Sequence, residues 1–141
     1  MPDPLQNIIA DSLETLHQED TMSFLSPGLQ KSVLKRLRKG GYGVDAELDL
    51  HGMTSRHALI RLLDFLHYCR ENGYECIRII HGKGYHSPEQ PVLKNELNAW
   101  LRQHRDVRAF CSTPQRAGGA GAIFVLLRLS DKFMHEDEDN G

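Results

Sequence analysis

The segment Leu48-Asp49-Leu50-His51-Gly52 places a carboxylate and an imidazole two residues apart, at the end of an expected strand. Side chains alternate along a strand, so Asp49 and His51 share one face while the leucines take the other. Because histidine titrates near neutral pH, His51 is a candidate general base or acid, and Asp49 could orient it or activate a nucleophile. The alternative is that Asp49 caps the following turn and His51 is a structural loop residue.

A second His-Gly unit, His81-Gly82-Lys83-Gly84, occurs where a second strand should end. His81 could act as a second catalytic histidine or donate to a phosphate. Gly82 and Gly84 would let backbone amides approach an anion, and Lys83 adds positive charge. The unit is not a nucleotide-binding Walker A loop, because Gly84 stands where Ser or Thr is required. A tight turn without substrate contact is the alternative.

A third glycine-rich loop, Gly118-Gly119-Ala120-Gly121, comes directly before an expected strand. It does not open a helix, so it is not a dinucleotide-binding fingerprint. It could let this loop pack against the first two loops or against a phosphate, and a purely structural role is equally open. Arg116, on the same loop, is a candidate phosphate contact.

Hydrophobic periodicity and turn residues predict the elements that position these loops. Strands are expected over 46–50, 75–80, 107–112 and 122–129, and helices over 28–39, 54–71 and 92–103. The order β-α-β-α-β-β has two connections long enough for right-handed parallel crossovers and a last one too short for a helix. We therefore expect an α/β two-layer sandwich with a mixed four-stranded sheet, whose last two strands pair antiparallel. His51 and His81 should then lie at the same sheet edge.

Charge is unevenly distributed along the chain. The net charge is −2, but residues 26–130 carry sixteen Lys and Arg against nine Asp and Glu, whereas the flanks carry one Lys and ten acids. A cationic body favours an anionic partner such as nucleic acid, although ordinary surface scatter is the alternative. Five basic residues fall between 31 and 39, and three of them are candidate nucleic-acid contacts: Lys35, Arg36 and Lys39.

The chain length predicts one main domain, residues 26–130, which includes the basic helix 28–39. Residues 1–25 are expected to be a weakly ordered arm, and residues 131–141 a disordered acidic tail. These acidic flanks could be autoinhibitory or only solubilising. The cysteines, Cys69, Cys76 and Cys111, have no CxxC spacing and indicate reduced core thiols.

The composition excludes several classes of protein. No apolar stretch approaches the ~20 residues of a membrane span, and no secretory signal is recognisable. We therefore expect a cytoplasmic protein with no membrane partner. The sequence offers no dense ligand set for a metal site, although a divalent cation such as Mg²⁺, bridged by substrate phosphates, stays open. The oligomeric state is not predicted.

Together, the three glycine-containing motifs resemble the signatures of the Smr (small MutS-related) domain family, in order and in spacing. The resemblance covers about residues 25–129 and is greatest with stand-alone proteobacterial proteins of the SmrA/SmrB type. The stretch 107–111 is closer to SmrA. The family often has Thr or Ser just after the last glycine, where this chain has Ala122.

This resemblance implies a fold similar to the C-terminal domain of bacterial translation initiation factor three. It also implies binding to DNA, RNA or ribosome-bound mRNA, often with endonuclease activity, and it matches Asp49 and His51 to positions tied to cleavage. The predicted function is therefore a nucleic-acid-binding endonuclease with Asp49, His51 and His81 as catalytic residues. The alternative is a non-catalytic nucleic-acid or ribosome-binding module.

Overall fold

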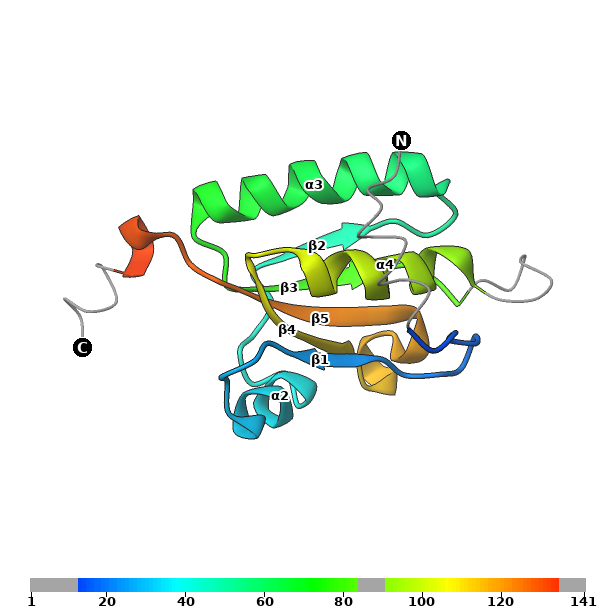
Figure 1. The fold of residues 1–141 in the computed structure, drawn as a ribbon, viewed down its shortest axis with the longest axis horizontal. Helices are drawn as coiled ribbons and strands as arrows, with labels where there is room; N and C mark the ends of the chain where they lie inside the picture. The colour runs from blue at the N-terminus through cyan, green and yellow to red at the C-terminus, as the bar shows by residue number, and fades with distance from the viewer. Residues whose placement is uncertain (1–12, 84–90, 135–141) are drawn as a thin grey trace.

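The computed structural model describes residues 13–83 and 91–134 of the chain (Figure 1). Five strands are present in this part: β1 (Ser23–Leu25), β2 (Ala46–Asp49), β3 (Cys76–Ile80), β4 (Val107–Ser112) and β5 (Ala122–Leu127). The helices are α2 (Lys31–Arg38), α3 (Ser55–Asn72) and α4 (Val92–Gln103), with 3₁₀ turns η1 (Gln115–Ala117) and η2 (Gly119–Gly121). No helix in the described residues is both long and apolar enough to cross a membrane.

The strands form one mixed sheet in the order β1-β4-β5-β3-β2. β2 and β3 pair in parallel, with Asp49 opposite Ile80, and β5 runs antiparallel to both β3 and β4. The predicted α/β class, the parallel crossover and the antiparallel pairing of the last two strands are confirmed. The predicted strand number of four is wrong, because β1 adds a fifth strand along β4. A three-residue strand is too short to show the alternation that identifies strands in a sequence.

The helices cover the two faces of the sheet unequally (Figure 1). Helices α3 and α4 lie on one face, where the larger core forms around Leu50, Leu62, Ile79 and Leu97. Helix α2 packs on the opposite face through Leu37, in a smaller core with strand residues such as Phe124. We call these the α3–α4 face and the α2 face. Alternation along β2 puts Leu48 on the α3–α4 face and leaves Glu47 and Asp49 exposed on the α2 face.

Capping residues explain the bounds of α3, which the sequence predicted within one residue. The Thr54 hydroxyl accepts a hydrogen bond from the His57 amide at 3.3 Å, and Gly73 ends the helix in the left-handed conformation. The three cysteines are buried and unpaired, as predicted.

The beginning of α2 differs from the prediction. The sequence predicted a helix from residue 28, but α2 begins at Lys31. Instead, the Ser26 carbonyl accepts the Leu29 amide at 3.2 Å, and Gly28 has a φ of 91°. The positive φ of Gly28 ends the first turn before a helix can propagate, so the helix starts one turn later.

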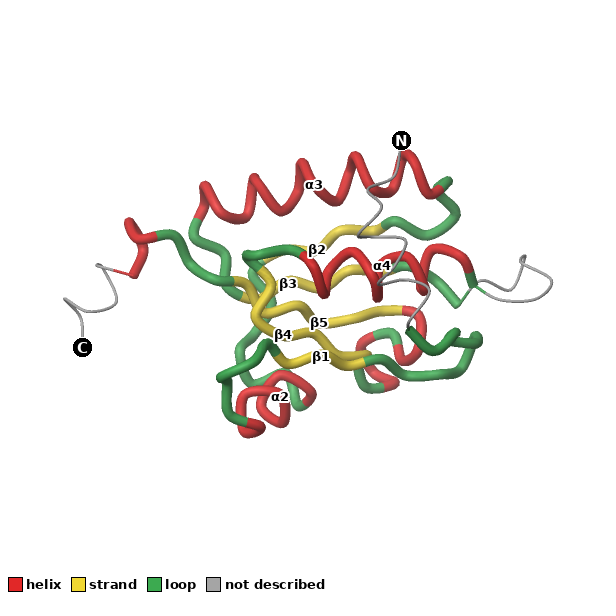
Figure 2. The backbone as a smooth tube through the Cα atoms, in the orientation of Figure 1, coloured by secondary structure: helices red, strands yellow, loops and turns green. Residues whose placement is uncertain are grey.

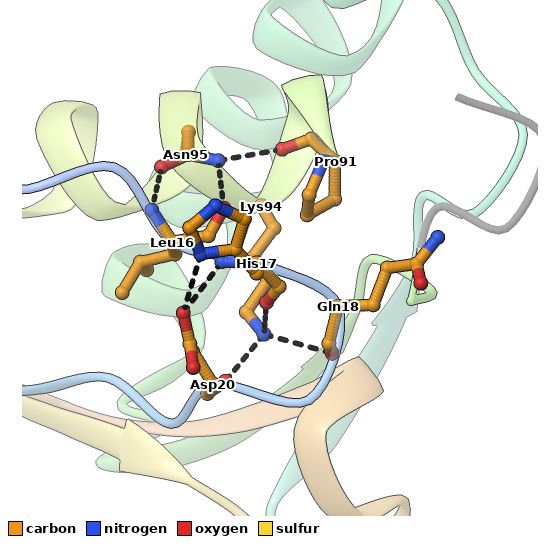
Figure 3. Close-up of polar contacts among 7 residues, drawn as sticks. All are labelled: Leu16, His17, Gln18, Asp20, Pro91, Lys94 and Asn95. Carbon is orange, nitrogen blue, oxygen red and sulfur yellow. Dashed lines mark hydrogen bonds and ion pairs between the residues drawn. The ribbon is translucent and has the colours of Figure 1, made fainter. Parts of the chain in front are cut away.

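The segment leading into β1 is tied to α4 by the buried side chain of Lys94, which has no solvent exposure (Figure 3). Its ammonium group donates to the carbonyl oxygens of His17 at 2.8 Å, Gln18 at 3.1 Å and Asp20. A buried ammonium is costly unless its donors are satisfied, and three carbonyls fill the three donor positions. The turn 17–20 is therefore built around the Lys94 side chain.

Asn95 completes this attachment. Its side-chain oxygen accepts the Leu16 amide at 2.8 Å, and its side-chain nitrogen donates to the Leu16 carbonyl at 2.9 Å (Figure 3). Further along, the Met22 amide donates to the Ser112 hydroxyl at 2.9 Å. Residues 13–25 are thus attached to the domain, and the expectation of a weakly ordered arm is wrong for them. Residues 1–12 lie outside the described part.

The beginning of the acidic tail also differs from the expectation of disorder. Residues 131–134 form one helical turn. The ring of Phe133 packs where a side chain at Gly73 would lie, since an added Cβ would come within 2.5 Å of it. The glycine that ends α3 therefore also provides the surface for Phe133. Residues 135–141 lie outside the described part.

Replacing Lys94 with methionine should lower the free energy of unfolding by about 2–4 kcal/mol, because three carbonyls lose charge-assisted hydrogen bonds. Urea unfolding followed by circular dichroism measures this change. Lys31→Met, at an exposed position of α2, removes the same charge and should change stability by less than about 0.5 kcal/mol. Equal effects of the two substitutions would contradict the role given to Lys94.

Candidate functional site

Asp49 and His51 form a hydrogen-bonded pair at the end of β2. The His51 Nδ1 atom lies 2.6 Å from Asp49 Oδ1, and the same oxygen accepts the His51 backbone amide at 3.0 Å. The hydrogen bond from the His51 side chain lowers the pKa of Asp49, so this carboxyl group is ionised at neutral pH. A carboxylate can only accept, so the shared proton belongs to Nδ1, and Nε2 is the ring nitrogen left to exchange a proton with a bound molecule. The predicted proximity of the two side chains is confirmed.

The pair is open to solvent, with 67% of the His51 side chain and 47% of the Asp49 side chain exposed. Asp49 and His51 continue the alternation that starts at the exposed residue Glu47. Both side chains therefore lie on the α2 face, away from the core beneath α3 and α4. An imidazole that is oriented by a carboxylate and accessible at Nε2 can take up or deliver a proton to a bound molecule. The geometry therefore permits acid–base chemistry at His51.

Three loops meet beside this pair, at the edge where β2 and β3 end and β5 begins (Figure 2). The Gly121 carbonyl accepts the amides of both His81 and Gly82, each at 3.0 Å. An added Cβ at Gly121 would lie 3.4 Å from Lys83 Cγ, and one at Gly82 would lie 3.4 Å from His51 Cβ. Of the alternatives left open for the third loop, the structure shows packing against the other two motif loops.

The same contacts correct the expected use of Gly82. Its amide was predicted to approach a bound anion, but it donates to the Gly121 carbonyl. Gly82 has a φ of 77°, a conformation that favours glycine, and this turns the chain toward the third loop. Gly84 lies outside the described residues.

Gly118 and Gly119 shape the third loop. Gly118 has a φ of 124°, and an added Cβ there would lie 2.7 Å from the Cβ of Ala122. The Gly119 carbonyl accepts the Thr113 hydroxyl at 3.2 Å. These contacts lie within the protein, so they support the structural alternative for both glycines.

Arg116 links the third loop to the basic helix. Its Nη2 atom donates to the Lys39 carbonyl, just beyond the end of α2, at 3.3 Å. Lys35 and Lys39 are exposed, whereas Arg36 stacks over the Tyr42 ring at 4.1 Å and donates to the Gly41 carbonyl at 3.2 Å. The guanidinium of Arg36 is therefore partly engaged within the protein. Arg116 therefore connects the third motif loop to the end of α2 on the α2 face.

Arg78 on β3 is a site residue that the sequence reasoning missed. Its guanidinium donates to the Glu47 carboxylate at 2.9 Å and to the Ala117 carbonyl at 2.7 Å. It thereby ties β2 to the loop that carries Arg116. The signal in the sequence was a single charge within the apolar strand 76–80, which indicates a position where one face of the sheet is not covered by a core.

His81 lies apart from the Asp49–His51 pair. Alternation from Ile77 and Ile79 places His81 on the α3–α4 side of the sheet, and it is only 4% exposed. Nδ1 lies 2.7 Å from the Gly82 carbonyl, and burial lowers the pKa of His81 to about 4. The ring is therefore neutral at pH 7, with the proton on Nδ1, and its buried Nε2 atom has no hydrogen-bond partner within the described structure.

Two further observations concern charge at the site. Lys83 Nζ lies 3.2 Å from each carboxylate oxygen of Glu19, in the segment attached to α4. In residues 13–83 and 91–134, no three His, Cys, Asp or Glu side chains come close enough together to hold a metal ion.

The chain is similar in sequence to known proteins. The family model described as "Smr domain" matches residues 48–128. The chain is 38% identical over 117 residues to a protein of Aliivibrio salmonicida named ribosome rescue factor SmrB, and 37% identical over 114 residues to the protein of that name from Yersinia enterocolitica. These matches cover 83% and 81% of this chain, but only 63% and 62% of the relatives.

Solved structures agree on the fold. YdaL, a stand-alone small MutS-related protein from Escherichia coli, superimposes with a TM-score of 0.71 at 30% identity, over 83% of this chain and 90% of YdaL. The Smr domain of Thermus thermophilus MutS2 gives a TM-score of 0.53 at 32% identity, over 59% of this chain and 98% of that domain. The chain belongs to the Smr domain family.

Proposed function

We propose that this chain binds nucleic acid at the ribosome through the α2 face of its Smr domain. The observation that carries the proposal is the contact of the three motif loops with one another and, through Arg116, with the end of the basic helix α2. The name ribosome rescue factor, carried by relatives that this chain matches over about 63% of their length, supports a ribosomal setting and hence the cytoplasm.

The proposed contact surface runs from Lys35 and Lys39, past Arg116, to the loop that holds Lys83. Lysine and arginine bind phosphates as cations, and such contacts position a strand without reading its sequence. Arg78 lies between these groups, but its charge is offset by Glu47. The strand backbone would therefore contact cations at both ends of this path, and the Asp49–His51 pair would face it at the loop end.

A second candidate function, endonuclease activity, is favoured by the Asp49–His51 geometry. His51 Nε2 would take the proton from an attacking hydroxyl group as its oxygen bonds to phosphorus, and Asp49 would stabilise the resulting imidazolium. The P–O bond to the leaving oxygen would break in the same displacement, and that oxygen would take a proton from water. Lys83 and Arg116 would offset the negative charge that develops on the phosphate oxygens. The names of the relatives describe ribosome rescue and not cleavage, so binding is the primary proposal and cleavage the second.

We assign His81 a positioning role in place of the predicted catalytic one. A buried neutral imidazole on the opposite face cannot donate a proton to a phosphate bound at His51. Its Nδ1 proton instead holds the Gly82 carbonyl, which orients the second loop.

Assignment of the chain to the SmrA or the SmrB branch of the family stays a prediction. Residues 107–111 favour the SmrA branch, whereas the relatives named above are SmrB proteins.

Substitutions should separate cleavage from binding. With labelled RNA and DNA oligonucleotides, with Mg²⁺ or EDTA, His51→Ala should slow any cleavage about 10²–10⁴-fold, the contribution typical of a general base. It should leave affinity within about twofold, because the phosphate contacts of the proposed surface come from lysine and arginine side chains. Lys35→Gln combined with Lys39→Gln should weaken binding and reduce its dependence on salt.

The matched control is His67→Ala, at an exposed position of α3, which should change neither quantity. Wild-type cleavage by the His51 variant would remove the endonuclease candidate. Binding that is unaffected by loss of both lysines would contradict the proposed surface.

The free energy of unfolding should decrease as the pH is lowered, because His81 is buried as a neutral ring. Its folded pKa of about 4 lies below the ordinary value of 6.5, so protonation favours the unfolded chain. The stabilisation is complete above pH 6.5 and is lost as the pH falls toward 4, by up to about 3 kcal/mol. Urea unfolding across this range measures it, and His81→Asn, which keeps a donor near Nδ1 but does not titrate, should flatten the curve. An identical pH dependence in the variant would contradict the burial of a neutral His81.

A further inference from the structure

The one motif lysine within the described residues is already paired with an acid. Both carboxylate oxygens of Glu19 lie 3.2 Å from Lys83 Nζ. The side chain of Lys83 is 26% exposed and that of Glu19 is 64% exposed, so the pair lies at the rim of the loop cluster. Because Lys83 packs on Gly121, next to the glycine that contacts His51, the Glu19 carboxylate lies beside the proposed phosphate path.

The side chain of Lys94 holds the backbone on either side of Glu19 in place (Figure 3). The carbonyls of Gln18 and Asp20, on either side of Glu19, both accept hydrogen bonds from the buried Lys94 ammonium. The imidazole and amide of His17 also bond to the Asp20 carboxylate, at 3.2 and 2.7 Å. The turn is therefore fixed before any ligand binds, and little conformational entropy opposes the contact between Glu19 and Lys83.

We propose that Glu19 is an intramolecular competitor for a phosphate subsite at Lys83. A carboxylate and a phosphodiester both present anionic oxygens to an ammonium group, so one can take the place of the other. A strand bound along the α2 face would displace the Glu19 carboxylate from Lys83 while Lys94 keeps the backbone in place. This inference rests on the proposed nucleic-acid binding and adds an element from outside the three motifs.

The expected size of the effect follows from the exposure of the pair. Exposed ion pairs contribute up to about 1 kcal/mol, so the competition should weaken binding by about two- to fivefold at low salt. It should disappear at high salt, because both the pair and the phosphate contact are screened. Glu19 therefore tunes the affinity and does not block the site.

The test measures affinity for a fluorescent single-stranded RNA oligonucleotide at low salt, in a His51→Ala background so that the RNA stays intact. Glu19→Gln should tighten binding about two- to fivefold. Glu14→Gln is the matched control, because Glu14 is exposed on the same segment and its loss changes the net charge equally. The control should have an effect of less than about 1.5-fold.

A double-mutant cycle with Lys83→Gln completes the test. Lys83→Gln should weaken binding, and adding Glu19→Gln to it should then change nothing. Equal gains from Glu19→Gln and Glu14→Gln, or a gain that survives without Lys83, would overturn the proposal while leaving nucleic-acid binding intact. No binding by any variant would overturn both this inference and the proposed function.

Discussion

The carbonyl oxygen of Gly121 holds the candidate site together. It accepts the amides of His81 and Gly82, both at 3.0 Å, and so joins the end of β3 to the beginning of β5. The parallel pairing of β2 with β3 brings the Asp49–His51 pair to the same edge. This shared acceptor links the backbones of the second and third loops directly, and Lys83 lies against Gly121 in the loop region that carries Arg116.

The two faces of the sheet have different roles. The α3–α4 face holds the larger core, and it also buries His81 as a neutral ring and Lys94 as a satisfied cation. The α2 face carries the exposed pair and the cations of α2 and Arg116, whereas Lys83 lies at the rim beside Glu19. Lys94 connects the two, because it fixes the turn that presents Glu19 to Lys83. The buried Lys94 ammonium thus determines that Glu19 is the acid that contacts Lys83 at the rim of the loop cluster.

Much of this architecture could be predicted from the sequence. Thr54 and Gly73 have the capping preferences of the two ends of α3, and the alternation of Leu48, Asp49 and Leu50 placed Asp49 and His51 on the face opposite the leucines. These signals are local, because caps and strand alternation act within a few residues.

The remaining features depend on contacts distant in sequence. A lysine such as Lys94 is typical of the surface of an amphipathic helix. Only the fold shows that residues 17–20 cover it. The sequence identified the motif that contains His81 but not the face of the sheet on which its side chain lies. A shift of one residue along a strand moves a side chain from solvent to the core. Arg78 could be noticed as a charge in an apolar strand, but its partners Glu47 and Ala117 come from other elements.

The central claim is that the three motif loops and the end of α2 form one binding surface on the α2 face. The most direct test is an NMR titration of the labelled His51→Ala protein with a single-stranded RNA oligonucleotide. Amide signals of Gly52, Lys83, Arg116 and Lys39 should shift together and with one dissociation constant. Signals of Ile60 and Leu63, exposed on the outer side of α3, should not move. Shifts confined to α3, or different dissociation constants for the loops and for α2, would contradict the account.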